Sequence, residues 1–142
     1  MKVLFLGDIV GRSGREALNR HLHKINLDNQ IDFTIVNGEN AAGGFGITEK
    51  ICGELYNAGA NAITTGNHLW DQKEISSYID KDHRLLKPYN SAEGTPGVGY
   101  NKNYHYDWNL QIKPPPYFPD LQSTDNSVIL KMASYGEAGS QD

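Results

Sequence analysis

Five polar residues of types that bind metals or transfer protons lie directly after three apolar segments of the chain. They are Asp8, Glu39, Asn40, Asn67 and His68. Taken singly, each has an ordinary structural interpretation as a turn residue, a helix cap or a buried histidine. The same order of apolar segment, glycine and polar side chain nevertheless occurs three times in series. This recurrence favours one shared functional site.

The chemistry of such a site follows from its side chains. Two carboxylates brought close together repel each other unless a cation neutralises them. Carboxylate and carboxamide oxygens suit hard to borderline divalent ions, and an imidazole extends the choice to iron, manganese and zinc. The five residues therefore predict a site for a divalent metal ion.

The apolar segments that precede these residues are expected to be buried strands. Residues 2–7, 33–38 and 61–66 are short apolar runs without alternation, which is typical of strands covered on both faces. Residues 84–90 contain a further short strand, which Pro88 should end. Polar residues at the carboxyl ends of neighbouring parallel strands meet at one edge of the sheet, where α/β proteins bind ligands.

The first helix is expected to follow the first strand. Leu18, Leu22 and Ile25 repeat at helical spacing, and Ser13 with Glu16 forms a capping box at its start. Two further helical patterns separate the later strands. The second carries Ile51 and Leu55 and should end at Gly59, and the third should begin after a capping box of Asp71 and Glu74.

These elements predict an α/β domain in the order β-α-β-α-β-α-β, with a largely parallel sheet and crossover helices. The character of the sequence changes after residue 91, where glycine and proline become frequent. We expect residues 1–100 to be the N-terminal part of one domain and residues 101–142 to be a less ordered tail. Residues 101–142 contain three consecutive prolines, and within them only residues 127–133 have a strand-like pattern.

Composition excludes several functional classes. The 142 residues include 13 Lys and Arg against 17 Asp and Glu, so no bulk nucleic-acid or membrane surface is expected. Cys52 is the single cysteine, which excludes a disulfide framework and a cysteine-rich zinc site. The start of the chain lacks the features of a signal peptide, so a cytoplasmic protein is expected. Arg12 and Arg15 fit either a phosphate-facing role or a solvent-exposed one.

Four segments of the sequence together resemble one known family. "GDIVGRSGR", "VNGENAAGGFGIT", "TTGNHLWDQKEI" and "LLKPYN" are similar, in order and in spacing, to the YmdB-like branch of the calcineurin-like metallophosphoesterases. These are bacterial 2′,3′-cyclic-nucleotide phosphodiesterases. The resemblance covers about residues 1–100. It implies the N-terminal half of a calcineurin-like αββα sandwich, in which two sheets pack together between helices.

The resemblance also implies a role for each polar residue. Asp8 and Asn40 correspond to ligands of one metal ion, Glu39 to the carboxylate that bridges two ions, and Asn67 to a ligand of the second ion. His68 corresponds to the acid that protonates the leaving oxygen. The implied reaction is attack on a cyclic nucleotide phosphodiester by a hydroxide that two divalent ions, iron or manganese, activate.

The resemblance is incomplete. The family continues past residue 142, and its later strands supply three more histidine ligands that this chain lacks. We therefore expect a truncated or frameshifted chain, or part of a split gene, that holds one ion at most and is a poor enzyme. An uncovered sheet face would promote self-association. The alternatives are an inactive family remnant and an α/β module that binds nucleotides without hydrolysing them.

Overall fold

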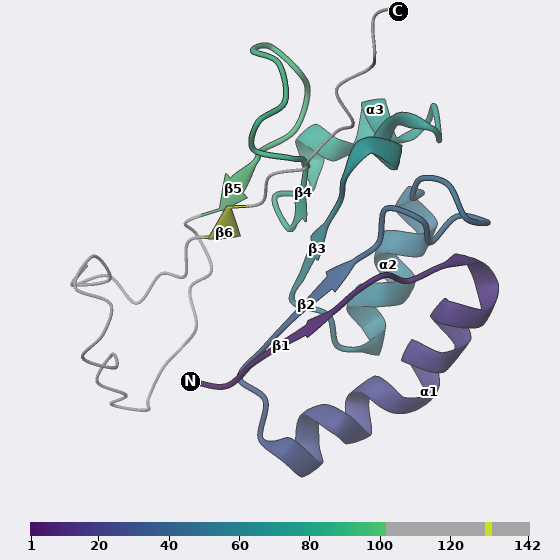
Figure 1. Ribbon diagram of the computed structural model, residues 1–142, viewed down its shortest axis with the longest axis vertical. Helices are drawn as coiled ribbons and strands as arrows, with labels where there is room; N and C mark the ends of the chain where they lie inside the picture. Colours follow the sequence, from purple (N-terminus) through teal and green to yellow (C-terminus); the bar gives the residue numbers. More distant parts are fainter. Residues whose placement is uncertain (102–129, 132–142) are drawn as a thin grey trace, which may run out of the picture.

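A four-stranded parallel sheet is the centre of the computed structural model, which describes residues 1–101 and 130–131. The strands lie side by side in chain order (Figure 1): β1 (Val3–Leu6), β2 (Phe33–Asn37), β3 (Ala62–Thr64) and β4 (Leu85–Leu86). Val3 pairs with Phe33, and Ile63 pairs with Leu85. The predicted α/β class and the predicted order of strands are confirmed.

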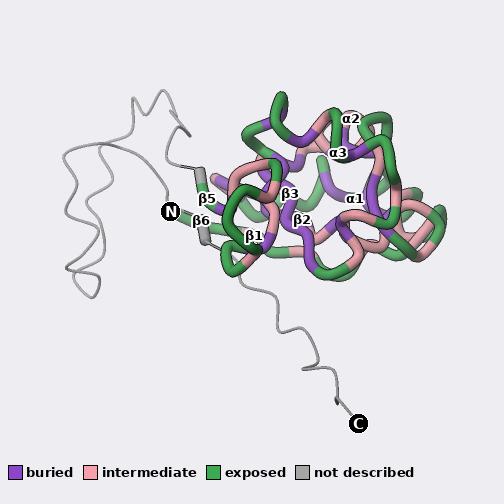
Figure 2. The backbone as a smooth tube through the Cα atoms, turned by 90° about the horizontal axis from the view of Figure 1, so that it is seen from above, coloured by how far each residue is buried: buried purple, intermediate pink, exposed green. Residues whose placement is uncertain are grey.

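The connections between the strands are helical. They comprise α1 (Gly11–Asn29), α2 (Glu49–Ala58), and a third crossover made of η1 (Asn67–Trp70), α3 (Ile75–Tyr78) and η2 (Ile79–Lys81). Each connection leads from one parallel strand to its neighbour, and every step moves the same way across the sheet. Such crossovers are almost always right-handed. All the helices therefore cover one face of the sheet, and buried residues gather between the two layers (Figure 2).

The main core lies between this face of the sheet and the helices. Leu18 and Leu22 of α1 are buried in it as expected, together with Ile51 and Leu55 of α2. Ile25 is 37% exposed, although it continues the apolar face of α1. The reason is that α2 ends level with Leu22 and Asn26, so it does not cover the last turns of α1.

The expected capping box of α1 is wrong. The helix begins at Gly11, two residues before Ser13, and no side chain caps it. Glu16 instead accepts a hydrogen bond from Nε of Arg12 at 2.6 Å. The backbone N–H of Gly11 donates to the carbonyl of Asn40 at 2.9 Å, so a contact with a distant loop fixes where α1 starts.

The end of α2 is confirmed, whereas the second capping box is wrong. Gly59 ends α2 with a φ of +116°, a left-handed conformation that favours glycine. Thr48 caps its start by accepting a hydrogen bond from the N–H of Ile51. Glu74 and Asp71 cap nothing by their side chains, because α3 begins at Ile75 without a side-chain cap and the Asp71 carboxylate contacts an imidazole instead.

A buried carboxylate joins the helices to the start of β4. Asp82, 7% exposed, accepts hydrogen bonds from the hydroxyls of Tyr56 and Tyr78, each at 2.8 Å. The backbone N–H of Arg84 also donates to it, and the Arg84 guanidinium lies 3.7 Å from the centre of the Tyr56 ring. Burial, reinforced by Asp82, raises the pKa of the Tyr56 phenol far above its usual range. These four residues therefore tie α2 and α3 to the amino end of β4.

The other face of the sheet is covered in part. Phe33, Ile35 and Ala62 form a small second buried cluster, whereas Val3 and Phe5 on β1 are about half exposed. Two further strands, β5 (Tyr100–Asn101) and β6 (Leu130–Lys131), form a separate antiparallel sheet. Strand β6 lies within the predicted strand segment 127–133. The other residues of that segment lie outside the described part of the chain. Self-association through the sheet remains a prediction.

Within the described residues, no helix is both long and apolar enough to cross a membrane.

Candidate functional site

The five predicted site residues follow the carboxyl ends of three neighbouring strands. Asp8 follows β1, Glu39 and Asn40 follow β2, and Asn67 and His68 begin the η1 turn after β3. A direct contact joins the first two strand ends, because Nδ2 of Asn40 donates to Oδ2 of Asp8 at 2.6 Å. Strand β2 lies between β1 and β3, so its polar residues are central to the group.

Glu39 extends the group from β2 to the end of β3. Its carboxylate lies directly against Gly66, the residue before Asn67. A Cβ placed on Gly66 would lie 2.7 Å from Cδ and 2.8 Å from Oε1 of Glu39, closer than atoms of this kind approach. Glycine at position 66 therefore provides the space that the Glu39 carboxylate occupies, and any larger residue would displace it.

Two oxygen atoms of this group are buried without a hydrogen-bond donor. They are Oε2 of Glu39 and Oδ1 of Asn40, and in the described part of the chain Oγ1 of Thr64 is a third such atom. The other oxygen of Glu39 has one long contact, at 3.5 Å from Nδ2 of Asn37. Buried polar atoms in folded proteins normally have partners. The two acceptors on Glu39 and Asn40 are the kind of oxygen ligands that a divalent cation would satisfy.

The described residues provide few strong metal ligands. Residues 1–101 contain no group of three or more His, Cys, Asp and Glu side chains arranged to hold a metal ion. Asp8 and Glu39 are the two carboxylates of the predicted set, and the amides of Asn40 and Asn67 complete it. The set fits a hard cation by its chemistry, and we expect its affinity to be low because amide oxygens carry no charge.

His68 is held by Asp71. Its Nδ1 lies 2.7 Å from Oδ2 of Asp71, the residue directly after η1. A carboxylate at this position favours the tautomer that carries its proton on Nδ1, which leaves Nε2 available to a ligand. Asp71, expected to be a helix cap, thus positions the imidazole. The three-residue spacing on a tight turn is the signal that could have indicated this pair.

The loop after β2 packs against the His68 turn. The ring centre of Phe45 lies 5.1 Å from that of His68, with the rings inclined at 70°. Arg15 holds the start of this loop by donating to the carbonyl of Ala41, and it also pairs with Glu54 of α2 at 3.2 Å. Arg15 therefore links α1, α2 and the loop.

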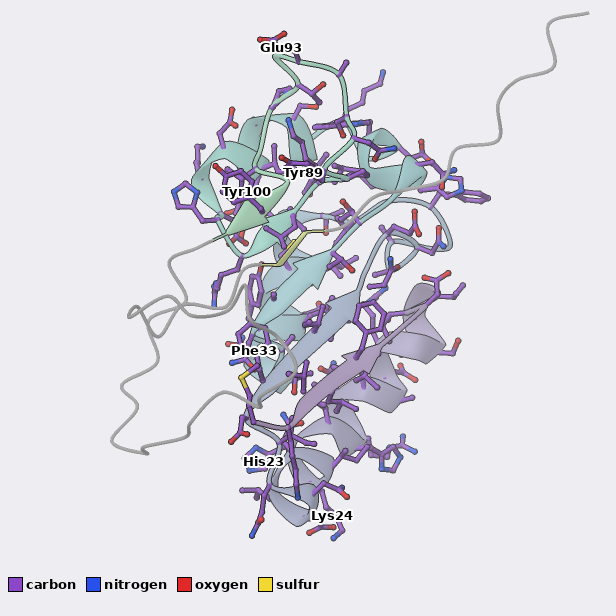
Figure 3. The ribbon with its side chains drawn as sticks, turned by 60° about the vertical axis from the view of Figure 1, so that its left-hand side comes forward. His23, Lys24, Phe33, Tyr89, Glu93 and Tyr100 are labelled. Carbon is purple, nitrogen blue, oxygen red and sulfur yellow. The ribbon has the colours of Figure 1, made fainter. Side chains whose placement is uncertain are left out.

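A surface hollow of about 580 Å³ lies elsewhere, beside β4. His83, Lys87, Tyr89 and Tyr100 are among the residues that line it, and none of the five predicted site residues is among them. Figure 3 shows Tyr89 and Tyr100 next to each other, with ring centres 6.1 Å apart. The same view shows His23 at the opposite end of the molecule, where it is exposed.

The fold and the edge residues define an α/β protein whose polar side chains gather at the carboxyl ends of parallel strands. A model of the YmdB-like protein family matches residues 4–112. The chain belongs to this family. The match extends to residue 112, past the predicted limit of the resemblance at about residue 100.

Similar proteins agree with this assignment. The chain is 50% identical over 99 residues to the 2′,3′-cyclic-nucleotide 2′-phosphodiesterase of Bacillus subtilis (strain 168), a match that covers 70% of this chain and 38% of the relative. A crystal structure described as a novel phosphatase of Mycoplasma pneumoniae is 34% identical, with a TM-score of 0.69, and covers 75% of this chain and 39% of that one.

A second solved structure, of a hypothetical protein from Thermus thermophilus, is 37% identical with a TM-score of 0.67. That match covers 72% of this chain and 39% of that one. The chain therefore spans about two fifths of the length of these three proteins.

Proposed function

We propose that this chain carries metal ligands and the proton donor of a phosphodiesterase that hydrolyses 2′,3′-cyclic nucleotides. The observation that supports it most is the pair of buried, unpartnered oxygens on the neighbouring residues Glu39 and Asn40 at the carboxyl edge of the sheet, where Asn40 also contacts Asp8. The name of the Bacillus subtilis relative supports phosphodiester chemistry on a cyclic nucleotide.

The proposed metal ligands are Asp8, Glu39, Asn40 and Asn67. Their oxygens suit iron(II) or manganese(II). When bound, the metal would neutralise charge on the phosphate and lower the pKa of the attacking water. Glu39 is the central ligand of the set, because its carboxylate reaches from the end of β2 to the end of β3.

The proposed role of His68 is to protonate the leaving ribose oxygen. A general acid must come within about 2.6–3.2 Å of the atom that it protonates. Asp71 contacts Nδ1, so the proton would pass from Nε2. Asp71 would also stabilise the charged imidazole before transfer and hold the ring in one orientation, as a carboxylate does for a catalytic histidine.

The test is metal binding and hydrolysis by the purified 142-residue chain. Manganese(II) is titrated and followed by electron paramagnetic resonance, and hydrolysis of 2′,3′-cyclic AMP is measured with the metal in excess. We expect weak manganese binding that Glu39→Gln abolishes, whereas Glu74→Gln, which changes an exposed carboxylate outside the set, leaves it unchanged. Equal manganese binding by the wild type and Glu39→Gln would contradict the proposed ligands. Binding of the nucleotide that persists with a chelator, without hydrolysis, would favour a non-hydrolytic nucleotide-binding module.

A further inference from the structure

Phe45 presents an exposed aromatic ring beside the proposed proton donor. The residue is 59% exposed, and its ring makes an edge contact with the imidazole of His68. Single exposed apolar residues are common on protein surfaces and need no explanation by themselves. The position of Phe45 is unusual because its backbone is fixed to the same turn that carries His68.

Two contacts fix this backbone. Nε2 of Gln72 donates to the carbonyl oxygen of Phe45 at 2.8 Å. A Cβ placed on the next residue, Gly46, would lie 2.8 Å from Cγ of Gln72 and 3.2 Å from the carbonyl oxygen of His68, so the loop packs directly on the turn. The backbone that carries the aromatic ring is therefore held in place before any ligand binds, which reduces the entropy lost on binding.

The geometry of the substrate connects this ring to the nucleobase. In a 2′,3′-cyclic nucleotide the 2′ oxygen and the base are attached to adjacent ribose carbons. If His68 donates its proton to the 2′ oxygen, the base must lie within a few bond lengths of the imidazole. The Phe45 ring, centred 5.1 Å from that imidazole, is then close enough for van der Waals contact with the base.

We propose that Phe45 is the stacking surface for the nucleobase and makes the site prefer purines. The inference rests on the proposed function, and it adds a residue that selects the substrate. Aromatic side chains stack on every base, and the larger purine ring system buries more of its surface in such a contact. Phe45 does not take part in the proton transfer.

The test compares ligands with and without a base. The probes are 3′-AMP, 3′-UMP and methyl riboside 3-phosphate, which carry the phosphate expected after cleavage of the 2′ bond. Their affinities for the 142-residue chain are measured by calorimetry with manganese(II) present. We expect 3′-AMP to bind about tenfold more tightly than methyl riboside 3-phosphate, the scale of one base–aromatic stack, with 3′-UMP in between.

Variants distinguish stacking from a general effect of the loop. Phe45→Ala should reduce the tenfold ratio to within about twofold, and Phe45→Trp should preserve it. Leu27→Ala, which removes another exposed apolar side chain near the far end of α1, should leave the ratio unchanged. A ratio that survives Phe45→Ala, while all three probes still bind, would overturn the stacking role and leave the proposed function standing. Failure of all three probes to bind the wild type would overturn both.

Discussion

Two carboxylates attached to the same sheet have contrasting surroundings. Asp82 lies before β4, at the amino edge of the sheet, and receives hydrogen bonds from two tyrosine hydroxyls and one backbone N–H. Glu39 lies after β2, at the carboxyl edge, and has a single long contact on one oxygen and no donor on the other. Both are carboxylates at the end of a parallel strand.

The difference is between a carboxylate that the fold supplies with donors and one that it leaves almost without them. A buried charge costs several kcal/mol unless donors or an opposite charge compensate it. Donors from α2, α3 and the start of β4 compensate Asp82. Glu39 has too few donors within the described part of the chain, and a cation is the partner that would complete its surroundings. Four predictions test this contrast, from the largest expected effect to the smallest.

The largest effect is expected on turnover at the carboxyl edge. His68→Ala should lower kcat for 2′,3′-cyclic AMP by about 10²–10⁴-fold, the usual contribution of a general acid, and should retain manganese binding. Rates are measured with saturating manganese(II). His23→Ala, at the opposite end of the molecule, is the control and should be neutral (Figure 3). Loss of manganese binding in His68→Ala would instead make His68 a ligand.

The next effect is expected on stability at the amino edge. Asp82→Asn removes a charged acceptor from the hydroxyls of Tyr56 and Tyr78, so the free energy of unfolding should fall by about 2 kcal/mol. Urea titration followed by circular dichroism measures it. The matched control is Asp28→Asn, which breaks an exposed pair with Lys24 and should cost less than about 0.5 kcal/mol. Equal losses of unfolding free energy in the two variants would show that Asp82 contributes no more to stability than an exposed carboxylate does.

The third effect is a dependence of stability on alkaline pH. Burial and Asp82 raise the pKa of Tyr56 in the folded state above its unfolded value of about 10. As the pH rises through 10 the unfolded chain loses this proton first, so the folded state loses stability. Between pH 9 and 11 the wild type should therefore lose about 1 kcal/mol more than Tyr56→Phe, measured by urea titration at each pH.

Burial also raises the pKa values of the Cys52 thiol and the Tyr78 phenol, and both groups are present in the wild type and in Tyr56→Phe, so they add to the alkaline loss of stability in both proteins. Parallel losses in the wild type and Tyr56→Phe would show that the phenol ionises as easily in the folded chain as in the unfolded one.

The smallest effect has the opposite sign. In the absence of metal, Glu39→Gln should raise the free energy of unfolding by about 0.5 kcal/mol, because it removes a negative charge that lacks donors. The measurement is a urea titration in the presence of a chelator. A loss of more than about 1 kcal/mol would mean that Glu39 supports the fold as Asp82 does.

The sequence predicts the elements better than their boundaries. The order of strands and helices and the end of α2 at Gly59 follow from local patterns and are confirmed. The start of α1 could not be predicted in this way. It depends on a hydrogen bond between Gly11 and Asn40, which are separated by α1 and β2. The capping residues Ser13 and Glu16 were present, yet the helix begins two residues before Ser13, at Gly11, whose N–H donates to the distant Asn40 carbonyl.

In the candidate site, too, local sequence patterns predict some features, and contacts between distant parts of the chain set the others. Its five polar residues are recognisable because each follows a strand, and their metal and acid roles remain predictions. The contact of Glu39 with Gly66 requires two strands to be placed side by side, and no spacing in the chain specifies it. The position of Phe45 beside His68 depends on a loop folding onto a turn, which is equally remote from local sequence.

The arrangement of the four strands in chain order has a consequence for biosynthesis. Each new strand is added beside the one synthesised before it, so every β-α-β unit can pair as soon as it leaves the ribosome. Asp8 and Asn40 can meet once β2 is present, and the Glu39 carboxylate reaches its place against Gly66 only when β3 has joined. His68 and Asp71 come directly after β3. The carboxyl edge would thus be assembled during translation in the order in which its residues are encoded.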